Sequence, residues 1–149
     1  MPYKRHKDES KLKAKCKLYC NDKRHYFHVF LWKDQESFDN NTLGNRPGVS
    51  RGCVNLAPSI IECIGDKERE IIRPKLGEIH FISNNWSLEI VAHELCHALV
   101  HRLRMLKTPT IQQVIDQEGS SEENICYEFG AWVDKIYRFV WENDKCRQE

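Results

Sequence analysis

Long hydrophobic runs are missing from this sequence, and glycine and proline are sparse, with seven and five residues among 149. The longest apolar stretch falls far short of the roughly 18–20 residues of a transmembrane helix, so we expect no membrane association. No repeat or low-complexity linker divides the chain, and 40% hydrophobic residues can build a core of ordinary size. The charged residues at the start are not followed by an apolar segment, which predicts no secretion signal. We therefore expect a cytoplasmic protein with one folded domain.

A disulfide framework is not indicated either. The seven cysteines are odd in number and scattered along the chain, which fits reduced thiols better than paired ones. Cys16, Cys20, His25 and His28 offer donors for a small separate zinc site, but their spacing matches no common zinc finger.

The net charge of +1 hides an uneven distribution, because residues 1–25 hold nine Lys or Arg against three Asp or Glu. We interpret residues 1–25 as a basic N-terminal arm and residues 26–149 as the folded domain. A basic arm raises the possibility of a nucleic-acid partner. Only Tyr3 and Tyr19 interleave aromatic rings with these charges, whereas single-strand binders use several. A solvated or protein-docking tail is therefore favoured over nucleic-acid binding.

The most informative feature is the pentapeptide His-Glu-Leu-Cys-His at residues 93–97, an HExxH motif. On an α-helix, residues four apart share one face about 6 Å apart along the axis, so His93 and His97 can bind one zinc ion. Glu94 lies beside them and can act as general base on a zinc-bound water. The alternative is a buried helix whose histidines merely find hydrogen-bond partners.

Residues around the motif predict that it lies on a helix. Ser87 is a suitable N-cap, and apolar residues recur at helical spacing after it: Leu88, Val91, Ala92, Leu95, Leu99, Leu103 and Leu106. His101 lies about 12 Å further along this helix than His93 and is turned away by about 80°. We therefore expect His101 to be a surface residue or to act behind the ligands, rather than to bind the metal.

A catalytic zinc usually has three protein ligands and one open position, so a third donor must come from elsewhere. A second helical pattern begins near Ser121, and acidic residues in its first turn suit the helix dipole. A glutamate near the start of a helix packed on the first would complete the site. We rank Glu123 first, then Glu122, then Glu128. Gly130 would let the two helices approach closely.

The order of a strand, the HExxH helix and a later helix with an acidic residue resembles the gluzincin class of zinc metallopeptidases. The short chain resembles the small ImmA/IrrE-type enzymes and related phage or mobile-element proteins. The match covers about residues 77–140, and in that type a glutamate often lies a few residues before a phenylalanine and a small residue, as Glu123 does here. The resemblance implies an α+β, minimal zincin-like domain. In it a small mixed or antiparallel sheet packs on the HExxH helix and on a C-terminal helix that carries the third ligand.

Residues 75–82 alternate apolar and polar side chains, which predicts a strand. The resemblance implies that it is an edge strand along the cleft, where an extended substrate can pair with it. Two further strands are predicted at residues 26–32 and 52–57, joined by a long polar loop. Residues 58–72 contain five isoleucines at mixed spacing and are assigned to a helix.

Together these features predict a zinc-dependent metallopeptidase that hydrolyses peptide bonds in intracellular proteins, with Zn²⁺ on His93, His97 and Glu123. Tyr127 or His80 would stabilise the oxyanion, since such sites need a donor opposite the metal. The alternative function is a catalytically idle zincin-fold module that binds a protein or a nucleic acid. Hydrolysis of a non-peptide amide is a third possibility, which the same donor set permits.

Overall fold

The computed structural model describes residues 7–43, 46–116 and 119–144. Its elements follow one another in this order: the 3₁₀ turn η1 (Glu9–Lys11), β1 (Leu12–Tyr19), β2 (Tyr26–Trp32), α1 (Gln35–Asn41), β3 (Gly52–Leu56), β4 (Ile60–Ile64), β5 (Lys67–Ile71), β6 (Lys75–Ile82), α2 (Leu88–Leu106), α3 (Ile111–Asp116) and α4 (Ser120–Asp144). The expected α+β class is confirmed. None of the described helices has the length and apolar character needed to cross a bilayer.

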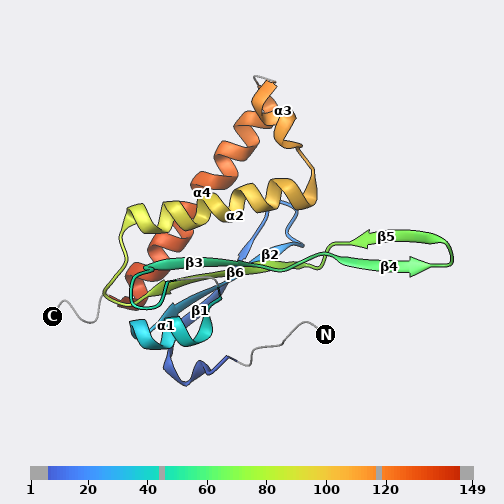
Figure 1. Cartoon of the computed structure of the whole chain (residues 1–149). Coiled ribbons are helices and arrows are strands. Elements are labelled where there is room, and N and C mark those ends of the chain that lie inside the picture. Colours follow the sequence, from blue (N-terminus) through green and yellow to red (C-terminus); the bar gives the residue numbers. More distant parts are fainter. Residues whose placement is uncertain (1–6, 44–45, 117–118, 145–149) are drawn as a thin grey trace.

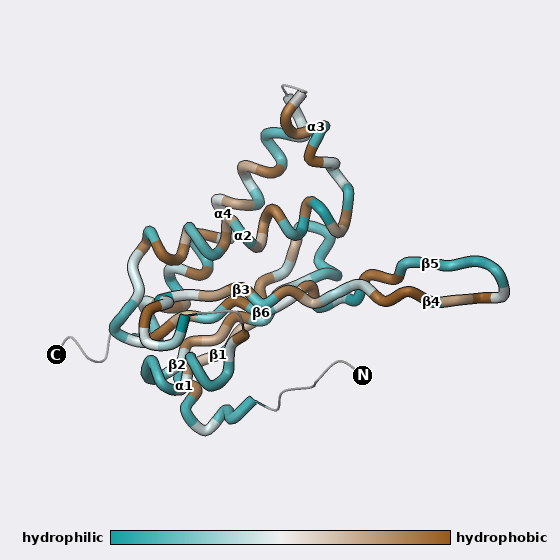
Figure 2. Tube along the Cα trace, in the orientation of Figure 1, coloured by the Kyte–Doolittle hydropathy of each residue, from teal (hydrophilic) through white to brown (hydrophobic). Residues whose placement is uncertain are grey.

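The main sheet has the strand order β1-β2-β6-β3. The central pair β2 and β6 is parallel, while both outer strands are antiparallel to their neighbours. The helices α2 and α4 cover one face of this sheet, and α1 lies against the other (Figure 1). The hydropathy colouring follows the same layers, with brown segments where the helices and strands meet (Figure 2).

Alternate residues of β2 point to the two faces, as the two-residue period of a strand requires. Phe27, Val29 and Leu31 join the core formed with α2 and α4. Phe30 and Trp32 point the other way and pack with Phe38 of α1. On the helical side the residues of β2 are therefore buried, whereas on the other side burial is complete only near α1.

The prediction that residues 75–82 form an edge strand is wrong. β6 is a strand as expected, but it lies between β2 and β3. Ile79 and Phe81 are fully buried on its helical side, and His80 is fully buried on the other. The edge strand beside α2 is instead β3.

The prediction of a helix over residues 58–72 is also wrong. The segment forms β4 and β5, a two-stranded hairpin that projects from the main sheet (Figure 1). Ile64 pairs with Lys67, so Gly65 and Asp66 form a two-residue turn, and the positive φ of Gly65, 63°, suits such a turn. That Gly-Asp pair, between two segments of strand length, was the local signal for a hairpin.

Part of the expected N-terminal arm belongs to the sheet. Residues 12–19 form β1, which pairs with β2 along its length, for example Cys16 with Val29. The boundary at residue 25 therefore does not separate an arm from the folded part. Residues 1–6, which include Tyr3, lie outside the described residues.

The predicted HExxH helix is confirmed, with Ser87 as its N-cap accepting a hydrogen bond from the backbone of Ile90. The loop before it is fastened to the end of α4. Asp144 accepts hydrogen bonds from the Asn84 backbone and from the Trp86 indole. Burial by itself raises the pKa of Asp144, but hydrogen bonds from Lys13 and from this loop outweigh it and hold the pKa well below its usual value. This contact fixes where α2 begins.

Candidate metal site

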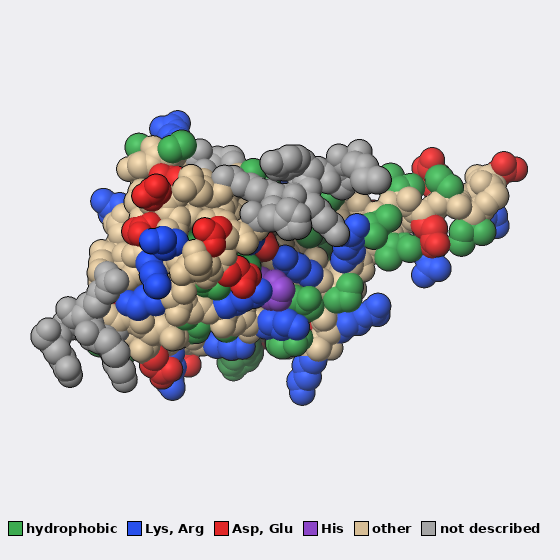
Figure 3. Space-filling model, turned by 90° about the horizontal axis from the view of Figure 1, so that it is seen from below, with side chains coloured by type: hydrophobic (Ala, Val, Ile, Leu, Met, Phe, Trp, Pro, Cys, Tyr) green, Lys and Arg blue, Asp and Glu red, His purple; other side chains and the backbone are tan. Residues whose placement is uncertain are grey.

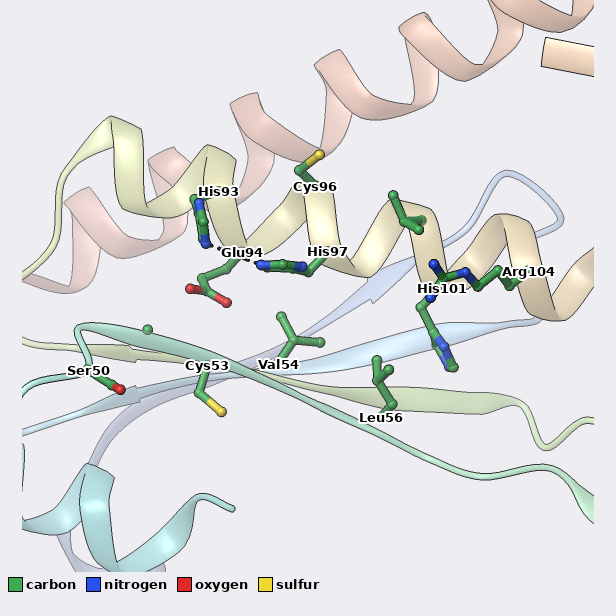
Figure 4. Close-up of a pocket in the computed structure, with 12 residues that line it drawn as sticks. Ser50, Cys53, Val54, Leu56, His93, Glu94, Cys96, His97, His101 and Arg104 are labelled. Carbon is green, nitrogen blue, oxygen red and sulfur yellow. Dashed lines mark hydrogen bonds between the residues drawn. The ribbon is translucent and has the colours of Figure 1, made fainter. Parts of the chain in front are cut away.

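A cleft of about 600 Å³ lies between α2 and the edge strand β3. The motif residues line it from the helix side, and the strand forms its other wall (Figure 4). Its lining residues are Ser50, Gly52, Cys53, Val54, Leu56, His93, Glu94, Cys96, His97, Val100, His101 and Arg104. Val54 and Leu56 point from β3 toward α2, whereas the Cys53 thiol points away (Figure 4).

The two motif histidines converge within this cleft. The Nε2 atoms of His93 and His97 are 3.2 Å apart, and both side chains are exposed to solvent. Two nitrogens bound to one tetrahedral zinc at 2.0–2.1 Å are about 3.3 Å apart by geometry. The histidine pair therefore fits a zinc ion as two of its ligands.

Glu94 lies beside the pair, with its carboxylate directed toward the start of β3 (Figure 4). Only 8% of the residue is exposed. Burial raises the pKa of Glu94 above its usual value, and His93 and His97 oppose this shift. A carboxyl group whose pKa is raised toward neutrality is well suited to take and return a proton.

Gly52 is a site residue that the sequence analysis missed. A Cβ atom built on Gly52 would lie 2.8 Å from Cγ and 3.1 Å from Oε1 of Glu94. Real Cβ contacts are almost never as short as 2.8 Å, so a side chain at position 52 would force the Glu94 side chain to shift. The available signal was a glycine at the start of a predicted strand, which often marks a close approach.

Replacing Gly52 with alanine is expected to displace the Glu94 carboxylate. A shift of about 1 Å in a catalytic group can cost about 10²-fold in rate. For the metal-assisted hydrolysis that the HExxH motif predicts, we therefore expect a loss of that order in rate, with unchanged metal content. Gly130→Ala is the matched control, because a Cβ there meets nothing within 4 Å. Equal turnover in Gly52→Ala and wild type would contradict this role.

The predicted third ligand is not with the histidines. Among the residues that the structure describes, no group of three or more His, Cys, Asp or Glu lies close enough to hold an ion. Glu122 and Glu123 are exposed, and the first turns of α4 lie beside α3, at the end far from the sheet (Figure 1). The expected close approach at Gly130 is also absent, since this residue faces open space.

Glu128, the remaining candidate, has a different role. Its Oε1 forms an ion pair of 2.9 Å with Nε of Arg102 on α2. Its Oε2 accepts a hydrogen bond of 2.7 Å from the backbone of Asn21. Glu128 is 1% exposed, so this buried pair joins α4 to α2 and to the β1–β2 turn. Its oxygens are occupied by protein partners, which excludes Glu128 as the ligand in this arrangement.

Neither residue proposed for the oxyanion is in the cleft. His80 is fully buried on the face of the sheet opposite the helices, where the Trp32 indole donates to its Nδ1 at 3.0 Å. Burial lowers the pKa of His80, which keeps the ring neutral. Tyr127 is 73% exposed and is not among the residues that line the cleft. His80 is therefore on the wrong face of the sheet for the predicted oxyanion role, and Tyr127 would have to move to act there.

Two other predictions concern nearby histidines. His101 is buried rather than on the surface, and it lines the far end of the cleft. Its ring packs edge-on against Phe27 of the core, with centroids 6.4 Å apart. His101 therefore joins α2 to β2 behind the two motif histidines. Cys16 and His28 lie on opposite faces of the sheet, which is incompatible with the alternative zinc site near the N-terminus.

The site thus joins two imidazoles able to share an ion, a buried carboxyl group next to them, and a strand edge across a cleft. Comparison with protein-family models, with curated proteins and with solved structures found no match. Function must therefore be argued from the geometry of these residues.

Proposed function

We propose that this protein is a zinc-dependent metallopeptidase with a zincin-like site that cleaves peptide bonds in intracellular proteins. The observation that carries the proposal is the convergence of the His93 and His97 Nε2 atoms, 3.2 Å apart, next to the buried Glu94. A histidine pair with a general base beside it is typical of metal-assisted hydrolysis. The alternative was a buried helix whose histidines only find hydrogen-bond partners inside the protein. The exposure of both His93 and His97 to solvent argues against it.

His93 and His97 would hold the zinc ion, which when bound would polarise the scissile carbonyl group and a water molecule. Glu94 takes the proton of the attacking water and returns it to the leaving nitrogen. Its position against Gly52 keeps the carboxylate in the cleft. Glu94 itself is not needed as a ligand.

β3 provides the substrate-binding edge in this proposal. It is an outer strand that runs along the cleft, so an extended polypeptide can add to it by backbone hydrogen bonds. Val54 and Leu56 face the cleft and would contact substrate side chains. This wall favours a peptide over a small amide substrate.

The cell compartment that we propose is the cytoplasm. The cysteines among the described residues are all free thiols, in keeping with a reducing environment. A peptidase in that compartment would act on few proteins, and the ImmA/IrrE-type resemblance suggests a regulator or host factor.

Elemental analysis of purified protein tests the proposal. We expect one zinc per chain in the wild type and loss of zinc in His93→Ala. Glu123→Ala, with Glu122→Ala as its matched control, tests the third ligand. Selective loss in Glu123→Ala would require the first turns of α4 to approach α2. A wild type without zinc under metal-replete conditions would overturn the peptidase.

A catalytically idle binding module is the second candidate. The lack of a third ligand among the described residues favours it, since catalytic zinc sites usually have three. This candidate predicts no cleavage of any protein by the zinc-loaded wild type, and capture of a partner that does not depend on Glu94.

A further inference from the structure

The described residues cover only part of the main-sheet face that lies opposite α2 and α4. α1 packs over one end of it, where Phe30 and Trp32 are buried with Phe38. The other end remains accessible, with Tyr19 44% exposed and Tyr26 and His28 partly exposed. Figure 3 views the molecule from this side and shows a histidine with Lys and Arg side chains and hydrophobic side chains next to it.

Four rings on this face form a continuous row, which we call the aromatic row: Tyr19 of β1 and Tyr26, His28 and Phe30 of β2. Successive ring centroids are 5.6, 5.2 and 6.0 Å apart along the row. Tyr19 and Tyr26 meet because they are direct partners in the β1–β2 register. The row therefore depends on a strand pairing that the sequence analysis did not foresee.

Lysines border the aromatic row on both sides. Lys15 and Lys17 come from β1, and Lys75 comes from β6 beyond β2. Nζ of Lys17 lies over the Tyr26 ring, 4.6 Å from its centroid, and Nζ of Lys15 lies over the Phe30 ring, 5.1 Å from its centroid. A stacking base would take the place of the Lys17 ammonium over Tyr26 and leave the ammonium free to meet a phosphate. Two carboxylates also lie here: Glu78, which is paired with Lys7 and Lys75, and Glu9, which is paired with Lys15.

His28 contributes a neutral ring to this surface. Burial, together with the nearby charges of Lys75, Lys15 and Lys17, lowers the pKa of His28 to about 4, although Glu78 acts in the opposite direction. The ring is therefore uncharged near pH 7. It adds an aromatic face without adding another positive charge beside the lysines.

We propose that this face binds single-stranded nucleic acid, with bases stacked on Tyr19, Tyr26 and His28. The phosphates would lie near the flanking lysines, Lys15, Lys17 and Lys75. Accessible rings edged by cations are the arrangement that single-strand binding uses, because every base has a face to stack and every link carries a charge. Tyr19, Tyr26 and His28 provide such rings, whereas Phe30 is buried at the end of the row. A duplex keeps its bases stacked on each other and would leave the rings without a partner. The metal-site cleft lies on the other face of the sheet, so this binding is independent of the proposed peptidase.

Fluorescence anisotropy with the full chain tests the proposal. The probes are labelled oligo(dT) and oligo(rU) of about 15 nucleotides, a length within single-strand site sizes, and a duplex of the same length. We expect tighter binding of the single strands than of the duplex. Tyr26→Leu should weaken single-strand binding about tenfold, since one stacked base is lost. Tyr19→Leu should act in the same direction, and its exposed ring makes a folding defect less of a concern.

Two lysine variants with the same change of charge separate this face from general electrostatics. Lys17→Glu should weaken binding. It should also lower the steepness with which the logarithm of the binding constant falls with the logarithm of salt concentration, by about one or more. Lys67→Glu, on the β4–β5 hairpin, should have little effect. Glu94→Gln should bind nucleic acid like the wild type.

The proposal is overturned if no oligonucleotide binds at low salt. It is equally overturned if both lysine variants lose affinity alike while both tyrosine variants bind normally. Co-sedimentation with vesicles rich in phosphatidylserine tests whether this face binds an anionic membrane instead. Vesicle binding that is lost in Lys17→Glu, without binding of any oligonucleotide, would assign the face to a lipid surface instead.

Discussion

Glu94→Gln is expected to lower peptidase activity by about 10²–10⁴-fold while zinc remains bound. Glutamine has nearly the same shape as glutamate but cannot accept the proton of the attacking water. General base catalysis contributes about 10²–10⁴-fold in rate, so a loss within that range is expected. Zinc should remain because His93 and His97 converge on the ion, and Glu94 is the base beside them.

The measurement is cleavage of a substrate protein by zinc-loaded wild type and variant, together with elemental analysis of both. Glu36→Gln is the matched control, since Glu36 is an exposed acid on α1, away from the motif. It should cleave at the wild-type rate. Wild-type activity in Glu94→Gln would show that another group acts as base, and loss of zinc would show that Glu94 is a ligand.

The inactive variant also serves to identify the substrate. A peptidase that binds but does not cleave should retain its full-length substrate, so one intact protein should be enriched with Glu94→Gln relative to wild type. Equal enrichment by both forms would favour the binding module, which does not depend on Glu94.

Local features of the site could be predicted from the sequence because they depend on residues close together in the chain. The histidine pair needs only a helix with a spacing of four, and Ser87 with the apolar repeat predicts that helix. The same repeat cannot tell which strand lies opposite. Gly52 reaches Glu94 across 42 positions of sequence, and no local pattern carries that contact.

The position of a strand within its sheet was similarly beyond local patterns. Residues 75–82 alternate as a half-buried strand does, yet β6 is central because β2 pairs with one of its edges and β3 with the other. His80 shows the consequence. Its polar ring occupies a buried position because Phe30 stacks on it, with centroids 4.8 Å apart, and the Trp32 indole bonds to it. Those partners come from a strand almost 50 residues earlier.

The three acidic candidates of α4 could not be separated by sequence for the same reason. Glu122, Glu123 and Glu128 all lie within the first turns of one helix. What distinguishes Glu128 is Arg102 on α2, which faces it only after the two helices pack. Composition and periodicity cannot predict the contact between Arg102 and Glu128.

Removing the Glu128 carboxylate is therefore expected to destabilise the fold rather than to remove the metal. Arg102 is 5% exposed, so Glu128→Ala leaves a buried guanidinium without its ion partner. Breaking a buried pair in this way costs about 3–5 kcal/mol. The backbone N–H of Asn21 also loses its acceptor, which adds to the cost.

Urea unfolding followed by tryptophan fluorescence measures the change, and elemental analysis of the folded protein measures zinc. Glu122→Ala is the control, because Glu122 is exposed at the start of the same helix. The free energy of unfolding of this variant should differ from that of the wild type by less than about 0.5 kcal/mol. If Glu128→Ala loses zinc but keeps wild-type stability, Glu128 is the third ligand and its pairing with Arg102 is dispensable.

A double variant separates the buried charge from packing. Arg102→Met with Glu128→Leu removes both charges and keeps most of the volume, so it should recover a large part of the loss seen in Glu128→Ala, because apolar replacements of buried pairs are often neutral. Recovery should stay incomplete, since the Asn21 N–H and the Thr108 carbonyl lose their partners. If the double variant is less stable than Glu128→Ala, the ion pair stabilises the fold by more than the desolvation of its two charges costs.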